Sequence, residues 1–221
     1  MPIPYAIQER LKAAGFKYHC FISYAHTINP DMTGCAERLE EAIQRELALS
    51  IPEPKVFRDK TNIKGGAKWE QMLKEALCTS VSMVAIFAPI YFDPAHQWCG
   101  LEWAAMAGLA KKRLPGEDFG TIIPVMIQAS DPLPQAVAQI QYIDFSKVRT
   151  LGYSYYDMPD YRRKVIEIVE RIEQIALGLD RHQAQADCDH FEIPQQTAFP
   201  DYVTPSQPFP LTRSHYETQR I

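Results

Sequence analysis

The sequence predicts an α/β fold in which helices cover both faces of a parallel sheet. Short runs rich in β-branched and aromatic residues alternate with longer segments whose apolar residues recur at helical spacing. One short run, at residues 81–88, is apolar except for Ser82, as expected for a strand that helices bury from both sides. Because strands and helices alternate along the chain, each helix serves as a crossover between neighbouring parallel strands.

The elements follow one another in a regular order. A short amphipathic helix comes first, with Ile7, Leu11 and Ala14 on one face, and Gly15 ends it. The expected strands are residues 18–24, 55–58, 81–88, 121–127 and 140–145. The expected longer helices are residues 34–49, 67–77, 98–112 and 158–179. Pro124 interrupts the fourth strand, so we expect that strand near an edge of the sheet.

Composition divides the chain into three parts. The 221 residues are 46% hydrophobic and 23% charged, which is typical of a globular protein. We assign an N-terminal helix to residues 1–15, one domain to residues 16–181 and a Pro-containing extended tail or linker to residues 182–221. This tail has five prolines, no glycine and five acidic residues against two basic ones, so it holds most of the net charge of −4. Its five aromatic residues favour partial docking on the domain or on a partner.

Charge and hydropathy exclude several classes of function. The mild acidity argues against a dedicated nucleic-acid-binding protein, which usually has a strong basic excess. No apolar run approaches the roughly 18 residues that span a bilayer, and the N-terminus lacks the pattern of a secretory signal. The five cysteines are odd in number and scattered, and no CxxC occurs. We therefore expect reduced thiols and a cytoplasmic protein that binds neither nucleic acid nor a membrane.

Polar and aromatic residues gather in three loops that follow the first three strands. Open parallel sheets bind ligands at the carboxyl ends of their strands, which makes these loops the expected site. The first loop begins at Ser23, Tyr24 and His26. The second contains Asp59, Lys60, Lys64, Gly65 and Gly66. The third enters a helix that carries Trp98, Cys99, Glu102 and Trp103.

These three loops resemble a known family. The segments FISYAH at 21–26, VFRDK at 56–60 with its glycine-containing loop, and WCGLEW at 98–103 are similar to the three sequence boxes of TIR domains. The resemblance covers about residues 16 to 180 and is nearest to the bacterial group. It implies a flavodoxin-like three-layer fold with a five-stranded parallel sheet. It also implies one of two activities, since some TIR domains only self-associate and others cleave NAD⁺ at the nicotinamide–ribose bond.

In the enzymatic kind the resemblance implies a glutamate of the third box as the catalytic residue, and Glu102 has that position. The chemistry suits a single carboxylate, because nicotinamide leaves as a neutral amine and needs no general acid. The transition state is an oxocarbenium-like ribose, whose positive charge a neighbouring carboxylate stabilises. We place Glu102 in the first turn of its helix. There it has a second interpretation, as an acidic residue that complements the helix dipole.

The remaining candidates each have a binding and a structural interpretation. Lys60, Lys64 and the Gly65-Gly66 pair could cradle a pyrophosphate or form a solvated turn. Trp98 and Trp103 could stack on a nucleotide ring or pack in the core, and packing is favoured for Trp103. The other substrate-binding candidates are Ser23, Tyr24, His26, Asp59 and Cys99.

Several of these candidates have a specific alternative role. Some TIR enzymes place basic residues just after the first strand, where this chain has Ala25-His26, so a phosphate contact from His26 departs from the family pattern. Asp59 could bind a ribose hydroxyl, but we favour a loop-capping role. Cys99 is expected to pack. We expect no metal site, although Asp187, Cys188, Asp189 and His190 are metal-ligand types.

Three functions compete at this stage. The first is an NAD⁺ glycohydrolase or cyclase that yields nicotinamide plus ADP-ribose or a cyclic isomer, with NAD⁺ as substrate and no cofactor. The resemblance implies activation by oligomerisation, a role in bacterial antiphage immunity and a separate sensor domain or protein. The second is a non-catalytic TIR module that only associates with other TIR domains. The third is a nucleoside-processing enzyme of similar fold, against which the WCGLEW box argues.

Overall fold

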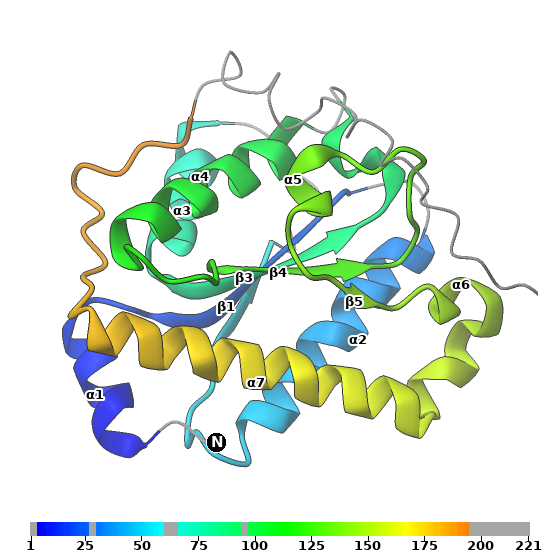
Figure 1. Cartoon of the computed structure of the whole chain (residues 1–221), viewed down its shortest axis with the longest axis horizontal. Coiled ribbons are helices and arrows are strands. Elements are labelled where there is room, and N and C mark those ends of the chain that lie inside the picture. The colour runs from blue at the N-terminus through cyan, green and yellow to red at the C-terminus, as the bar shows by residue number, and fades with distance from the viewer. Residues whose placement is uncertain (1–3, 27–29, 60–65, 94–96, 195–221) are drawn as a thin grey trace, which may run out of the picture.

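The sheet of the protein is parallel, and its strand order is β2-β1-β3-β4-β5 (Figure 1). The computed structural model describes residues 4–26, 30–59, 66–93 and 97–194. Within them the strands are β1 (Tyr18–Tyr24), β2 (Val56–Arg58), β3 (Ser80–Phe87), β4 (Ile122–Met126) and β5 (Ile143–Asp144). This order is that of flavodoxin-like folds, so the predicted fold class is confirmed.

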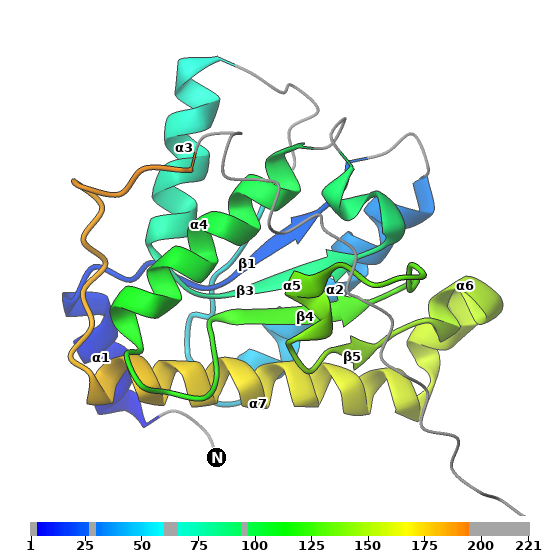
Figure 2. The same ribbon diagram turned by 45° about the horizontal axis from the view of Figure 1, so that its top comes forward.

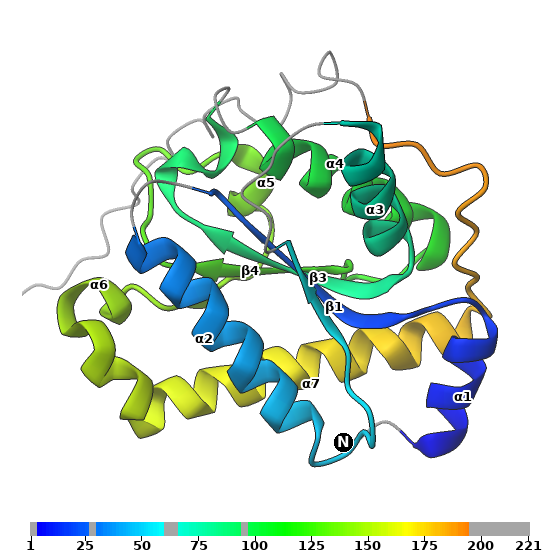
Figure 3. The same ribbon diagram turned by 180° about the vertical axis from the view of Figure 1, so that it is seen from behind.

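Helices cover both faces of the sheet (Figure 2). One face carries α1 (Tyr5–Ala13), α2 (Pro30–Leu47) and α7 (Pro159–Arg181). The other carries α3 (Ala67–Cys78), α4 (Gln97–Arg113) and α5 (Gln135–Ala138). The helices α2 and α7 cross on their shared face (Figure 3). Among the described residues, no helix combines the length and the hydrophobicity that crossing a bilayer requires.

Strand alternation explains why the core has two halves. Successive side chains of a strand point to opposite faces, so the two neighbours of one residue contact the same helix layer. In β1, Cys20, Ile22 and Tyr24 belong to the cluster under α2 and α7, whereas Phe21 belongs to the cluster under α3 and α4. Every residue of β3 is buried, as its apolar run predicts. The sheet interior therefore has no room for solvated polar groups, which are confined to its ends.

Most of the predicted elements are present within a few residues of their expected bounds. The structure adds short pieces that the sequence analysis did not predict: η1 (Pro89–Phe92), α5, α6 (Lys147–Leu151) and η3 (Gly152–Asp157). These pieces have too few residues to show a hydrophobic period. Gly15 has a φ of 92°, a left-handed conformation that ends the first helical segment where the sequence predicts.

The prediction that Pro124 marks a strand near an edge of the sheet is confirmed. Strand β4 lies between β3 and β5, with Pro124 opposite Ala85 of β3. Thr121 accepts a hydrogen bond from β3 and Ile127 donates one to it, so by alternation the nitrogen of Pro124 faces β5. Strand β5 pairs only with Val125 and Met126. No described residue of β5 is opposite Pro124, so its missing N–H costs no ladder bond.

The expectation that the cysteines are all reduced is wrong for two of the five. Cys78, at the end of α3, forms a disulfide with Cys188, and the two positions are 110 residues apart in sequence. The free cysteines Cys20, Cys35 and Cys99 are buried. The sequence contains no spacing that would identify this pair, because a disulfide between distant cysteines depends on the fold alone.

Residues 182–194, the described part of the predicted tail, lie on the surface of the domain. They leave the end of α7 and run along the side of α3 and α4 (Figures 1 and 2). Ala186 donates a backbone hydrogen bond to Ala14, and Phe191 is buried in the cluster under α3 and α4. Lys74 of α3 forms an ion pair with Glu192 at 2.7 Å. Residues 182–194 are therefore held on the domain both by the disulfide and by noncovalent contacts.

We expect Cys188→Ser to lower the free energy of unfolding by about 2 to 4 kcal/mol, because a crosslink removes chain entropy from the unfolded state. Denaturant unfolding under oxidising conditions measures the difference. Wild-type protein treated with a reductant should fall to the stability of the variant. Equal stability of oxidised wild type and variant would contradict the prediction.

Candidate active site

Glu102 lies where the ends of β1 and β3 meet the beginning of α4. The hydroxyl of Ser23 donates a hydrogen bond to its Oε2 at 2.5 Å, and the same hydroxyl is 2.6 Å from the Oη of Tyr91. All three residues are buried, with Tyr91 fully so. Since Ser23 gives its proton to the carboxylate, it accepts the proton of Tyr91. The three side chains thus form a directed chain of hydrogen bonds that ends on Glu102.

The protonation of Tyr91 agrees with that direction. Burial raises the pKa of the Tyr91 phenol well above its ordinary value, and the electrostatic influence of Cys99 and Glu102 adds to the effect. The phenol therefore keeps its proton and remains a donor toward Ser23. Cys99, itself buried, borders this group from the same helix as Glu102.

Each member of the chain is placed by a different element. Ser23 is the sixth residue of β1 and points to the face under α3 and α4. Tyr91 comes from η1, a single tight turn that starts at Pro89 directly after β3. Glu102 is the sixth residue of α4, which begins at Gln97. The expectation that Glu102 lies in the first turn is therefore wrong, and the helix dipole, which acts over the first turn, does not explain this residue.

A second group of side chains joins the end of β2 to the same region. Asp59 is buried and accepts a hydrogen bond from Nε1 of Trp69 at 2.9 Å. The ring of Trp69 packs edge-on against Trp98, with 4.6 Å between centroids. These contacts connect the second loop, α3 and the first turn of α4. The anchoring of Asp59 by Trp69 fits the structural role that we favoured for it.

The two tryptophans of the third box have different surroundings. Trp103 is 1% exposed and packs against Tyr91 and Phe92, as its core interpretation predicts. Trp98 is only partly buried, so of the two it is the one that can meet a ligand. Gly66 has a φ of 108°, which favours glycine, and apart from its chain neighbours no described atom stands within 4 Å of the place where a Cβ would be.

Arg58 supports the end of β1 from the other face of the sheet. Its Nε donates to Glu40 at 2.7 Å, and its Nη1 donates to the Oη of Tyr24 at 3.3 Å. Burial opposes the charge, but the bonds from Glu40 and Tyr24 outweigh it and hold the pKa of Arg58 above its ordinary value. Tyr24 in turn stacks on His26, with 4.3 Å between ring centroids. The hydrogen bond from Arg58 therefore holds Tyr24 in the position in which it stacks on His26.

The structure brings most of the predicted site residues to one edge of the sheet, while Lys60, Lys64 and Gly65 lie outside the described residues. Sequence reasoning did not select Tyr91, Trp69 or Arg58. Tyr91 is a tyrosine inside an apolar run that follows a buried strand, and a hydroxyl at such a place must find a partner. The expected burial of this hydroxyl was the feature of the sequence that could have identified Tyr91. Trp69 and Arg58 had no comparable signal beyond their proximity to Asp59.

Comparisons with known proteins identify a family. A family model described as TIR domain matches residues 20–154. Among solved structures, the chain is similar to the TIR domains of "the activated Roq1 resistosome directly recognizing the pathogen effector XopQ". That match has 16% identity and a TM-score of 0.38, and covers 70% of this chain and 84% of the other. No curated protein gave a significant match.

We expect Glu40→Ala to lower the free energy of unfolding by about 3 kcal/mol, because it leaves the buried guanidinium of Arg58 without its shorter ion pair. Glu37→Ala is the matched control, since Glu37 bonds the same guanidinium at 3.3 Å but is 54% exposed. Its cost should stay under about 1 kcal/mol. Denaturant unfolding measures the loss of stability in both variants. Equal losses would disprove that Glu40 is the more important ionic partner of Arg58.

Proposed function

This chain belongs to the TIR domain family, and we propose that it is one of the members that cleave NAD⁺ between nicotinamide and ribose. The observation that carries the proposal is the buried carboxylate of Glu102, which accepts a hydrogen bond from Ser23 at the carboxyl edge of the sheet. This edge is where open parallel sheets bind their ligands. Burying a carboxylate costs desolvation free energy, which an exposed surface glutamate does not incur. A function at this edge gives a reason for that cost.

In the proposed reaction the bond between ribose C1′ and the nicotinamide nitrogen breaks, and its electron pair leaves with nicotinamide. The positive charge that was on the pyridinium ring moves to the ribose as the bond lengthens. Glu102 stabilises that charge, as a fixed anion in a site of low dielectric does. Water then forms the new bond to C1′ and loses a proton, which gives ADP-ribose. Capture by an adenine nitrogen instead gives a cyclic isomer.

The neighbouring residues have proposed roles in binding. Trp98, partly exposed and braced by Trp69, offers a ring face for stacking. His26 lies at the same edge and could donate to a phosphate or a ribose hydroxyl. The proposed pyrophosphate cradle of Lys60, Lys64, Gly65 and Gly66 stays a prediction. Activation by self-association, a sensor partner, a cytoplasmic location and a role in antiphage immunity are further parts of the same proposal.

We expect purified protein, concentrated or clustered on a surface, to release nicotinamide from NAD⁺. Glu102→Gln should reduce the rate by about 10²- to 10³-fold, because it removes the charge and keeps the shape. The matched control is Glu173→Gln, since Glu173 is also buried and also accepts from a serine hydroxyl, Ser50, at 3.2 Å. It lies on α7, on the opposite face of the sheet, and should keep the wild-type rate.

Two outcomes separate the alternatives. If clustered wild-type protein releases no nicotinamide, the enzyme proposal fails and the non-catalytic interaction module replaces it. If Glu102→Gln and Glu173→Gln lose activity to the same degree, the proposal for Glu102 fails while an enzyme remains. Chromatography of the product then distinguishes linear from cyclic ADP-ribose.

The hydrogen-bond chain behind Glu102 predicts a graded series. Ser23→Ala should lower kcat by about tenfold or more, because it removes a hydrogen bond to a charged group. Tyr91→Phe should cost less, since the phenol acts on the carboxylate only through Ser23. Tyr155→Phe is its control, as the Tyr155 hydroxyl bonds Asp160 at 3.2 Å away from the site. A larger loss from Tyr91→Phe than from Ser23→Ala would reverse the proposed order of the chain.

A further inference from the structure

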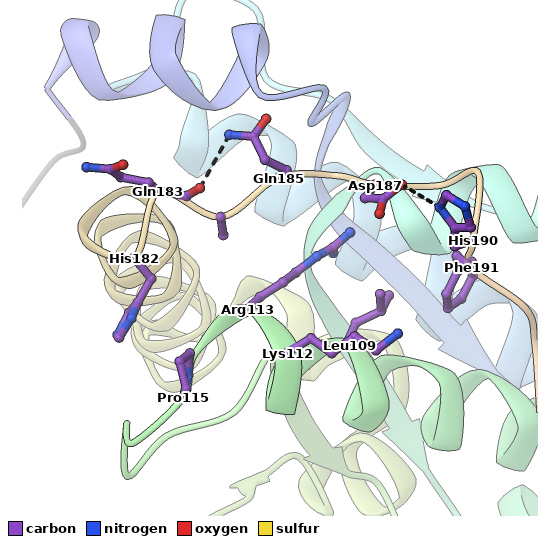
Figure 4. Close-up of a pocket in the computed structure, with 11 residues that line it drawn as sticks. Leu109, Lys112, Arg113, Pro115, His182, Gln183, Gln185, Asp187, His190 and Phe191 are labelled. Atoms are coloured by element: carbon purple, nitrogen blue, oxygen red, sulfur yellow. Dashed lines mark hydrogen bonds and ion pairs between the residues drawn. The ribbon is translucent and has the colours of Figure 1, made fainter.

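A cavity of about 350 Å³ lies between the end of α4 and residues 182–191, away from the candidate active site (Figure 4). Its wall from α4 includes Leu109, Lys112 and Arg113, and residues 182–185, Asp187, His190 and Phe191 close it from the other side. Its volume is within the range of small-molecule sites, about 300 to 1,000 Å³. Arg113 is the last residue of α4 and Glu102 lies 11 residues before it, about 16 Å away along the axis at 1.5 Å per residue. The cavity is therefore a separate feature.

Arg113 is a buried cation at the wall of this cavity. It is 6% exposed, its Nη2 donates to the backbone oxygen of Cys78 at 2.7 Å, and its guanidinium lies 5.0 Å from the ring centroid of Phe16. Among the described residues no carboxylate comes within 4.0 Å of it. Burial lowers the pKa of Arg113 to about 10, against an opposing effect of Asp187. A buried charge normally has an ionic partner, and an ion pair for Arg113 is absent from the described chain.

The other charges on the wall are mostly positive. Lys112 is exposed at the rim, and two histidines line the wall, of which His182 lies 3.0 Å from the carboxylate of Glu117 outside it. Asp187 is the one carboxylate of the wall, and it lies 3.6 Å from Nδ1 of His190. The amide of Gln185 bonds back to the backbone of Gln183, as Figure 4 shows. The wall thus has two cations, Arg113 and Lys112, and one carboxylate, Asp187, which lies next to His190.

We propose that this cavity binds a phosphorylated small molecule, with Arg113 as the ligand for the phosphate and Lys112 as the second cation. A guanidinium offers five N–H donors in a planar fork that matches two oxygens of a phosphate. Phe191, buried at the far wall, supplies an apolar surface for the rest of the molecule.

The disulfide connects this site to the fold around it. Cys78 holds the guanidinium through its carbonyl and is bonded through its sulfur to Cys188, which lies between two wall residues, Asp187 and His190. Any ligand that contacts both walls stabilises residues 182–191 in the position that they have here. Reduction of the disulfide therefore weakens the binding, and the bound ligand stabilises the folded chain.

Calorimetric titration of the full chain with inorganic phosphate, AMP and adenosine tests the site. We expect heat of binding and a raised Tm with phosphate and with AMP, and neither with adenosine. Lys112→Ala should weaken AMP binding by about tenfold. Lys111→Ala is the matched control, because the neighbouring exposed lysine does not line the cavity, and it should leave the affinity unchanged. Arg113→Gln should abolish binding.

Three results would overturn the proposal. The first is the absence of binding by both phosphate and AMP. The second is equal weakening by Lys112→Ala and Lys111→Ala, which would indicate general charge attraction. The third is AMP binding that survives Lys112→Ala unchanged, which would locate the nucleotide elsewhere, such as beside Glu102. If Arg113→Gln does not fold, the comparison of the two lysine variants still decides. Nicotinamide release by Lys112→Ala without phosphate should equal that of the wild type.

Discussion

The burial of β1 and β3 on both faces is the constraint on which the rest of the structure depends. Because helices cover both sides, a polar side chain on these strands must find a partner inside the protein. Ser23 meets this requirement through Glu102 and Tyr91, and Tyr24, one residue later, meets it through Arg58 on the other face. The candidate site is therefore where two polar networks, one on each face, reach the carboxyl edge of the same strand.

The same alternation continues on β2 and links the two networks. Arg58 turns toward α2, where Glu40 lies, and Asp59 turns toward α3, where Trp69 lies. Two consecutive residues thus fasten the second loop to opposite helix layers. Trp69 carries the connection to Trp98 at the beginning of α4. A change in either layer therefore reaches the end of β2 through these contacts.

Sequence reasoning predicted the long helices from their strong apolar periods, and it predicted the strands from the short runs of β-branched and aromatic residues between them. It also placed the strand of Pro124 near an edge of the sheet, and the fold shows why the proline is tolerated there, because β5 pairs only with Val125 and Met126. It expected Glu102 in the first turn of its helix, although the expected start at residue 98 is only one residue from the observed start, and Glu102 is the sixth residue of α4. Tyr91 and Ser23 are 68 residues apart and Cys78 and Cys188 are 110 apart, so only the folded chain relates them.

The position of the disulfide also has a mechanical consequence. The bond between Cys78 and Cys188 closes a covalent ring that contains β3, β4, β5 and α4, and with them Tyr91 and Glu102. Tension applied along the backbone passes through the crosslink and bypasses the ring. The ring contains roughly 380 Å of extended chain, which therefore does not lengthen while the disulfide is intact. Ser23 lies outside the ring. A pulling force would therefore separate Ser23 from Glu102 while the helix that carries Glu102 remains unstretched.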